Sequence, residues 1–124
     1  MSSITGLLHA SLLIADLDRA RSFYEGVLGL VACPDRPDLG FPGVWYDVGG
    51  GGQIHLLRLA NPDPVEGRPE HGGRDRHTAL GVMDLQAMQA RLTAAGVPFS
   101  LSRSGRRALF CRDPDGNALE LIQV

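Results

Sequence analysis

The chain contains no lysine, because its twelve basic residues are all arginines. A protein without lysine cannot form a Schiff base through its own side chains, and it cannot build a phosphate loop that depends on a lysine. Fourteen acidic residues balance the arginines, which gives a formal net charge of −2. The chain therefore has no overall positive field, and we expect neither DNA nor RNA as a partner.

Long hydrophobic runs and paired cysteines are also missing. The longest apolar stretch near the N-terminus, residues 12–15, ends at Asp16, so we expect no signal segment and no membrane span. The two cysteines, Cys33 and Cys111, are far apart and form no C-x-x-C pair. This spacing indicates neither a disulfide framework nor a cysteine zinc site. We expect two buried, inert thiols in a cytoplasmic protein.

A repeat divides the chain into two halves. His9 and His77 each precede an Asp-Leu pair by seven residues, and the two histidines are 68 positions apart. The aspartates of these pairs, Asp16 and Asp84, are placed as helix N-caps, and apolar residues with helical spacing follow each of them. The sequence therefore predicts one amphipathic helix in each half, ending near a glycine.

Strand-like segments surround each predicted helix. In the first half they cover residues 7–15, 30–33, 44–48 and 53–59, and in the second half residues 77–82, 99–102, 107–111 and 117–123. The order is βαβββ twice within one domain of residues 1–124. The first module spans about 4–60, a linker rich in proline and glycine about 61–76, and the second module about 77–124. We expect an α+β fold whose curved sheets surround a metal-binding cavity, with the helices on the outer face.

Strand alternation places four candidate metal ligands opposite the helices. Side chains alternate between the two faces of a strand, and the apolar neighbours of these residues belong to the helix-covered core. The candidates are His9, His55, His77 and Glu120. Such groups bind divalent transition metals such as Zn, Ni, Co, Mn or Fe(II), and an octahedral ion would keep two positions open for vicinal substrate oxygens. The remaining histidine, His71, lies in the linker, where we expect a solvated side chain.

Aromatic and basic residues supply candidates for substrate binding. Trp45 and Tyr46 adjoin on one predicted strand, so one must face the cavity and the other the helical layer. Ordinary packing is the alternative for either ring. Arg103, Arg106 and Arg107 surround a predicted turn. They are candidates for binding a substrate carboxylate or phosphonate, and a solvated charged turn is the alternative.

Three segments resemble the vicinal oxygen chelate superfamily. They are residues 7–30 (LLHASLLIADLDRARSFYEGVLGL), 76–82 (RHTALGV) and 112–122 (RDPDGNALELI). The superfamily includes glyoxalase I, fosfomycin-resistance enzymes, methylmalonyl-CoA epimerase, extradiol dioxygenases and bleomycin-binding proteins. The resemblance covers essentially the whole chain and implies the paired βαβββ fold, but it does not select one reaction.

The resemblance also implies a ligand set. His9, His77 and Glu120 match the ligand positions on the first, fifth and eighth strands of the family. His55 falls at the fourth-strand position, where glyoxalase I carries a glutamate. Metal-bound carboxylates help to move the substrate proton in such enzymes, so their proton shuttle does not carry over unchanged. Glu120 and His55 are the catalytic candidates, and His55 can act as a base only if it is not tied to the metal.

This resemblance implies a metal-dependent small-molecule enzyme, and it favours a glyoxalase-like lyase or isomerase. The alternatives are an extradiol-type dioxygenase, a fosfomycin-type thiol transferase and a metal-free, drug-sequestering protein of the bleomycin-resistance type. A thiol co-substrate such as glutathione is a further open point. Family members of this size commonly dimerise and share their sites. Each metal would then take His9 and His55 from one subunit, and His77 and Glu120 from its partner.

Overall fold

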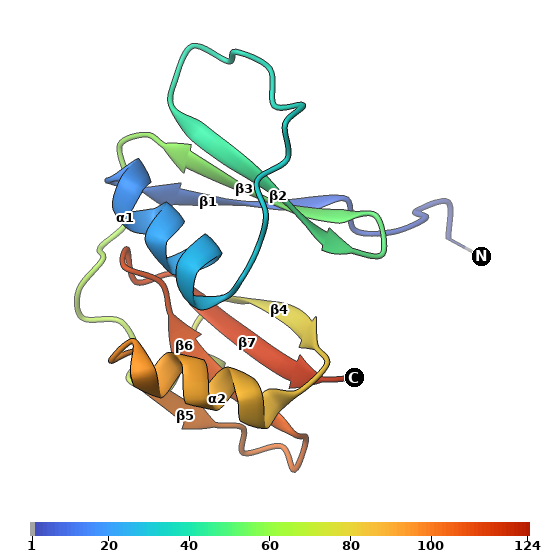
Figure 1. Ribbon diagram of the computed structural model, residues 1–124, viewed down its shortest axis with the longest axis vertical. Coiled ribbons are helices and arrows are strands. Elements are labelled where there is room, and N and C mark those ends of the chain that lie inside the picture. The colour runs from blue at the N-terminus through green and yellow to red at the C-terminus, as the bar shows by residue number, and fades with distance from the viewer. Residues whose placement is uncertain (1) are drawn as a thin grey trace.

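The structure is a computed structural model that describes residues 2–124, and it contains two open sheets (Figure 1). Sheet A consists of β1 (His9–Ile14), β3 (Gly52–Arg58) and β2 (Gly43–Gly49), in that spatial order. Sheet B consists of β4 (His77–Val82), β7 (Ala118–Gln123), β6 (Ala108–Arg112) and β5 (Phe99–Leu101). The expected α+β fold is confirmed.

Each half of the chain also carries the predicted helix. In the first half, α1 (Leu17–Arg21) continues as the π-helical η1 (Ser22–Val27), and the second half contains α2 (Leu85–Ala94). The Asp16 carboxylate accepts a hydrogen bond from the Arg19 amide, and Asp84 accepts one from the Ala87 amide, so both predicted N-caps are confirmed. Within the described residues, no helix has the length and apolar character that a membrane crossing requires.

The predicted strand at residues 30–33 was wrong. This segment meets sheet A only through an isolated bridge between Ala32 and Tyr46. At its start, the Leu30 amide donates to the Tyr24 carbonyl, which keeps the chain attached to the end of the π-helix. At its other end, Pro34 has no amide proton to continue a ladder. These two constraints leave too few residues between them for a strand.

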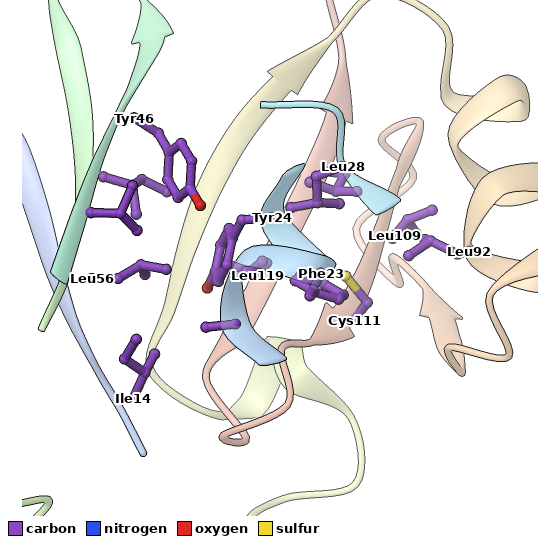
Figure 2. Close-up of a cluster of buried hydrophobic side chains, with 14 of the residues drawn as sticks. Ile14, Phe23, Tyr24, Leu28, Tyr46, Leu56, Leu92, Leu109, Cys111 and Leu119 are labelled. Carbon is purple, nitrogen blue, oxygen red and sulfur yellow. The ribbon is translucent and has the colours of Figure 1, made fainter. Parts of the chain in front are cut away.

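The apolar faces of the two sheets share one core, and the first helix lies between the sheets (Figures 1 and 2). Ile54 and Leu56 of sheet A, and Leu119 of sheet B, are buried on this side. The Tyr24 ring is fully buried, and its hydroxyl donates to Asp113 Oδ2 at 2.7 Å. Because both apolar faces turn inward to this core, the opposite faces of the two sheets point away from each other.

Candidate active site

The open face of sheet A, the face turned away from α1, carries a stack of three rings. Trp45 on β2 lies opposite His55 on β3, and their ring centroids are 4.1 Å apart with an interplanar angle of 8°. His9 on β1 covers the other side of His55, also at 4.1 Å and with an angle of 16°. His55 is only 8% exposed because a flat ring covers it on each side. Neighbouring rings and the sheet therefore fix the orientation of this imidazole.

Hydrogen bonds determine which nitrogen of His55 is free. Asp47 Oδ1 accepts from the Gln53 side-chain amide at 2.8 Å, so the Gln53 carbonyl oxygen faces His55 Nε2, also at 2.8 Å. A carbonyl oxygen can only accept, so Nε2 carries the proton and Nδ1 keeps the lone pair. Burial lowers the pKa of His55 below its usual value, and the nearby charges of His9 and Arg36 act in the same direction.

The open face of sheet B carries the second pair of candidate ligands. His77 on β4 donates its Nδ1 proton to the Asp75 carbonyl at 2.9 Å, which leaves the lone pair on Nε2. Nε2 lies 3.4 Å from Glu120 Oε1 on β7, and Glu120 is only 2% exposed. A neutral imidazole nitrogen and a carboxylate oxygen this close repel each other unless a proton or a cation lies between them. Their chemistry and orientation fit a divalent transition metal.

One arginine of the turn between β5 and β6 reaches this second pair. Arg106 donates from Nη2 to Glu120 Oε2 at 3.3 Å. In the part of the chain that the structure describes, Arg103 and Arg107 make no side-chain hydrogen bond or ion pair. The structure therefore brings Arg106 to the candidate site. The sequence favoured Arg103 and Arg107 as substrate-binding residues, and position in the turn gave no reason to prefer Arg106.

Trp45 and Tyr46 separate onto opposite faces, as the alternation of a strand requires. Trp45 belongs to the ring stack on the open face. Tyr46 has no exposed surface and donates from its hydroxyl to Glu25 Oε2 at 2.8 Å on the helical side. Tyr46 is thus part of the core. Of the two aromatic candidates, only Trp45 lies beside the candidate ligands.

His71 is not the solvated loop residue that its place in the linker predicted. Its Nδ1 lies 2.7 Å from Ser100 Oγ, and its ring meets Phe110 edge-on at 4.9 Å. Gly72 permits this approach, because a Cβ at that position would come within 3.2 Å of Phe110 Cβ. The adjacent glycines of the linker were the sequence signal for a close backbone approach to sheet B. Phe110 also contacts the His77 ring edge-on at 5.1 Å, so the linker borders the second ligand pair.

The structure thus joins the four candidate ligands in two pairs. His9 lies with His55, and His77 lies with Glu120. Among residues 2–124, no group of three or more histidine, cysteine, aspartate or glutamate side chains is arranged to hold a metal ion. The four do not converge within one chain, because the two open faces point away from each other.

Known proteins are similar to this chain in sequence and in fold. The sequence profile described as Glyoxalase/Bleomycin resistance protein/Dioxygenase superfamily matches residues 6–121. Glyoxylase I 4 of Arabidopsis thaliana is 28% identical over 123 residues, which cover 95% of this chain and 70% of the relative. Lactoylglutathione lyase of Haemophilus influenzae is 29% identical over 124 residues, which cover 94% of this chain and 91% of the relative.

Solved structures agree with the sequence comparison. A glyoxalase family protein from Bacillus anthracis aligns with a TM-score of 0.81 at 22% identity, over 99% of this chain and 98% of that chain. At this identity the likeness shows the fold. With the profile match over nearly the whole sequence, these findings place the chain in the Glyoxalase/Bleomycin resistance protein/Dioxygenase superfamily.

Proposed function

We propose that the protein is a metal-dependent enzyme of small-molecule metabolism that binds its substrate through vicinal oxygens, with glyoxalase-like lyase or isomerase chemistry. The observation that carries this proposal is the pairing of His77 with Glu120, whose free lone pairs face each other at 3.4 Å. Relatives named lactoylglutathione lyase, which align with nearly their whole length, support the choice of reaction class. A thiol such as glutathione would then be a co-substrate.

A second copy of the chain would complete the ligand set. Each chain offers His9 and His55 on one open face, and His77 and Glu120 on the other. We propose a homodimer in which the open face of sheet A of one subunit meets the open face of sheet B of its partner. Each dimer would then hold two equivalent sites related by two-fold symmetry.

Within such a site, the residues of the chain divide the work. A bound divalent metal would polarise neighbouring substrate oxygens and acidify the carbon-bound proton beside them. His55 is held neutral by burial and presents its lone pair at Nδ1, where it can bind the metal or accept that proton. Glu120 is the second proton acceptor, and Arg106 stabilises its charged form. Trp45 keeps water from one side of the His55 ring.

Metal analysis tests the proposal. Wild-type protein reconstituted separately with Ni, Zn, Mn or Fe(II) should retain one ion per chain after desalting. Glu120→Ala should lose this metal while keeping its circular dichroism spectrum, because a buried metal-binding carboxylate is removed. Glu66→Ala, a change at an exposed glutamate of the linker, is the matched control and should keep the metal. Full metal content in Glu120→Ala would remove this residue from the site.

His55→Ala separates the two roles open to the imidazole. Loss of the metal would make His55 a ligand and favour a four-ligand lyase or isomerase. Retention of the metal with loss of turnover would make it a base. If the variant retains iron or manganese, the next assays are oxygen uptake with a catechol and epoxide opening with a thiol.

A metal-free binding protein is the second candidate, and the ring stack favours it. Trp45, His55 and His9 lie nearly parallel, an arrangement that suits planar drug molecules. Bleomycin titrated against Trp45 fluorescence, with and without EDTA, distinguishes the two candidates. Undiminished binding in EDTA would favour sequestration over metal-dependent catalysis.

A further inference from the structure

Arg36 differs from every other arginine of the chain. Over residues 2–124, six arginines pair with carboxylates and five others are exposed to solvent. Within this described part of the chain, Arg36 is the one half-buried arginine that lacks a carboxylate partner. A guanidinium group is always charged, and placing it away from water without a counter-charge is unfavourable. Such a residue calls for an explanation at its own position.

The position of Arg36 is beside the candidate site. It lies in the loop that joins η1 to β2, and this loop arches over sheet A on the side away from α1 (Figure 1). A Cβ at Gly43 would come within 2.9 Å of Arg36 Nη2, so the guanidinium lies directly over this glycine. Gly43 precedes Trp45 by two residues on β2, which puts both on the open face. Arg36 therefore lies next to the stack of Trp45, His55 and His9.

The loop holds the Arg36 side chain in place but leaves hydrogen-bonding capacity unused. Nη2 donates to the Phe41 carbonyl at 2.9 Å, and the guanidinium carbon lies 5.3 Å from the centre of the Phe41 ring. Nε is buried and has no hydrogen-bond partner among residues 2–124. Among the described residues Nη1 also has no hydrogen-bond partner, and unlike Nε it is not buried, so it is the N–H group open to a carboxylate, phosphonate or phosphate.

We propose that Arg36 binds an anionic group of the substrate, so that the site selects small molecules carrying an oxyanion beside their chelating oxygens. The inference rests on the proposed function for the identity of the site, and it adds the substrate class. In the proposed dimer, Arg36 of one subunit and Arg106 of the other would both line the site. Anion binding at Arg36 itself needs no metal, which makes it separately testable.

The single tryptophan of the chain provides the readout, because Trp45 stacks beside the proposed anion site. We would titrate chelator-treated protein with inorganic phosphate at constant ionic strength, replacing chloride. Trp45 fluorescence and the Arg36 Nε–H signal in a proton–nitrogen correlation spectrum should both change and saturate. Arg36→Gln should weaken this binding about tenfold or more. Arg36→Lys should restore part of it, because lysine returns the positive charge but not the paired N–H donors of the planar guanidinium.

Arg58→Gln is the matched control. Arg58 is exposed, and strand alternation puts it on the same face of β3 as the buried Ile54 and Leu56, away from the ring stack. This variant should bind phosphate as the wild type does. Equal affinity in Arg36→Gln and wild type, or the absence of saturable binding in the wild type, would overturn the inference. Metal content measured on the same preparations separates the two proposals. Metal without anion binding contradicts only this inference, and anion binding without metal contradicts only the proposed function.

Discussion

His55 and His77 each have one ring nitrogen fixed by a hydrogen bond, and they present different nitrogens to the candidate site. The Gln53 side-chain carbonyl, itself fixed by Asp47, accepts a hydrogen bond from His55 Nε2. The Asp75 backbone carbonyl accepts a hydrogen bond from His77 Nδ1. Hydrogen-bond partners of this kind fix both the tautomer and the orientation of a ligating imidazole. The free lone pairs are therefore on Nδ1 of His55 and on Nε2 of His77.

This assignment predicts two tautomers in metal-free protein. Long-range proton–nitrogen correlation spectra, recorded at a pH high enough to keep both imidazoles neutral, should show His55 protonated at Nε2 and His77 protonated at Nδ1. Gln53→Ala should leave His77 unchanged and produce a mixture of tautomers at His55, because the acceptor for its Nε2 proton is gone. A His55 ring protonated mainly at Nδ1 in the wild type would contradict the assignment.

Asp75 connects the linker to sheet B through two arginines. Its carboxylate accepts from Arg68 Nε and Nη2 at 2.8 and 2.7 Å, and from Arg112 Nη1 at 2.8 Å. The Arg68 contact, with Arg112 in support, holds the pKa of Asp75 well below its usual range. Asp75→Asn should lower the free energy of unfolding by about 2 kcal/mol near neutral pH, measured by urea denaturation.

The sign of the pH dependence follows from the lowered pKa of Asp75. The stabilisation is complete above the ordinary carboxyl pKa of about 4 and is lost as the pH falls further toward the lowered folded-state value. The difference between wild type and Asp75→Asn should therefore shrink in acid. A difference that stays constant from neutral pH to about pH 2, a range that extends below the ordinary carboxyl pKa, would show that the ion pairs are not its source.

At the scale of elements, the turn η2 (Gly72–Arg74) packs against sheet B beside the ligand pair His77 and Glu120. Gly72 lies against Phe110 and Ala118, where a Cβ would come within 3.2 and 3.5 Å of their Cβ atoms. Gly72→Ala should therefore lift the turn, loosen the contact of His71 with Ser100, and destabilise the protein by about 2 kcal/mol. Thermal and urea unfolding measure this change.

Gly26→Ala is the control for the Gly72 variant. Gly26 lies inside η1, and among the described residues no atom beyond its chain neighbours and its own helix backbone would come within 4 Å of a Cβ there. Alanine at this position should leave stability unchanged or raise it by up to about 1 kcal/mol. Equal unfolding free energies for the two variants would mean that the close approach of η2 to sheet B is unimportant.

Local signals were sufficient for most elements. The predicted strand at residues 77–82 has the observed bounds of β4, and both aspartate N-caps form as expected. Strand alternation correctly separated Trp45 from Tyr46, because the two faces of a strand differ in burial over a few residues. Caps and alternation are properties of neighbouring residues, so a single sequence contains them.

Contacts between distant segments explain where the sequence-based predictions differ from the structure. The segment at residues 30–33 has strand-like composition, but a hydrogen bond to the helix end and the proline at its exit limit it to one bridge. His71 and Arg36 are both in connecting segments, and each owes its place to a glycine that lets the chain approach a sheet closely. Loop shapes of this kind depend on tertiary packing, which composition does not reveal.

At the scale of the whole molecule, the two sheets share one core and turn their ligand-bearing faces outward. The sequence indicated which residues share a face, because alternation is local. It did not indicate how the faces of the two modules are arranged, since that depends on how the first helix packs between the sheets (Figure 2). We propose that complete sites form only when two chains combine.

A mixing experiment with two variants tests this claim most directly. His9→Ala and Glu120→Ala should each lose metal when purified alone, because every site then lacks one ligand. In a mixed dimer, one site takes His9 and His55 from the Glu120→Ala chain, and His77 and Glu120 from the His9→Ala chain. That site is intact, and its counterpart lacks both altered ligands.

After unfolding and refolding of an equal mixture, half of the dimers should be mixed, and each should hold one intact site. The mixture should therefore recover about one quarter of the wild-type metal content and should sediment as a dimer. If the mixture binds no more metal than the separate variants, although wild-type protein taken through the same steps binds metal fully, then the sites are not shared between chains and the account is wrong.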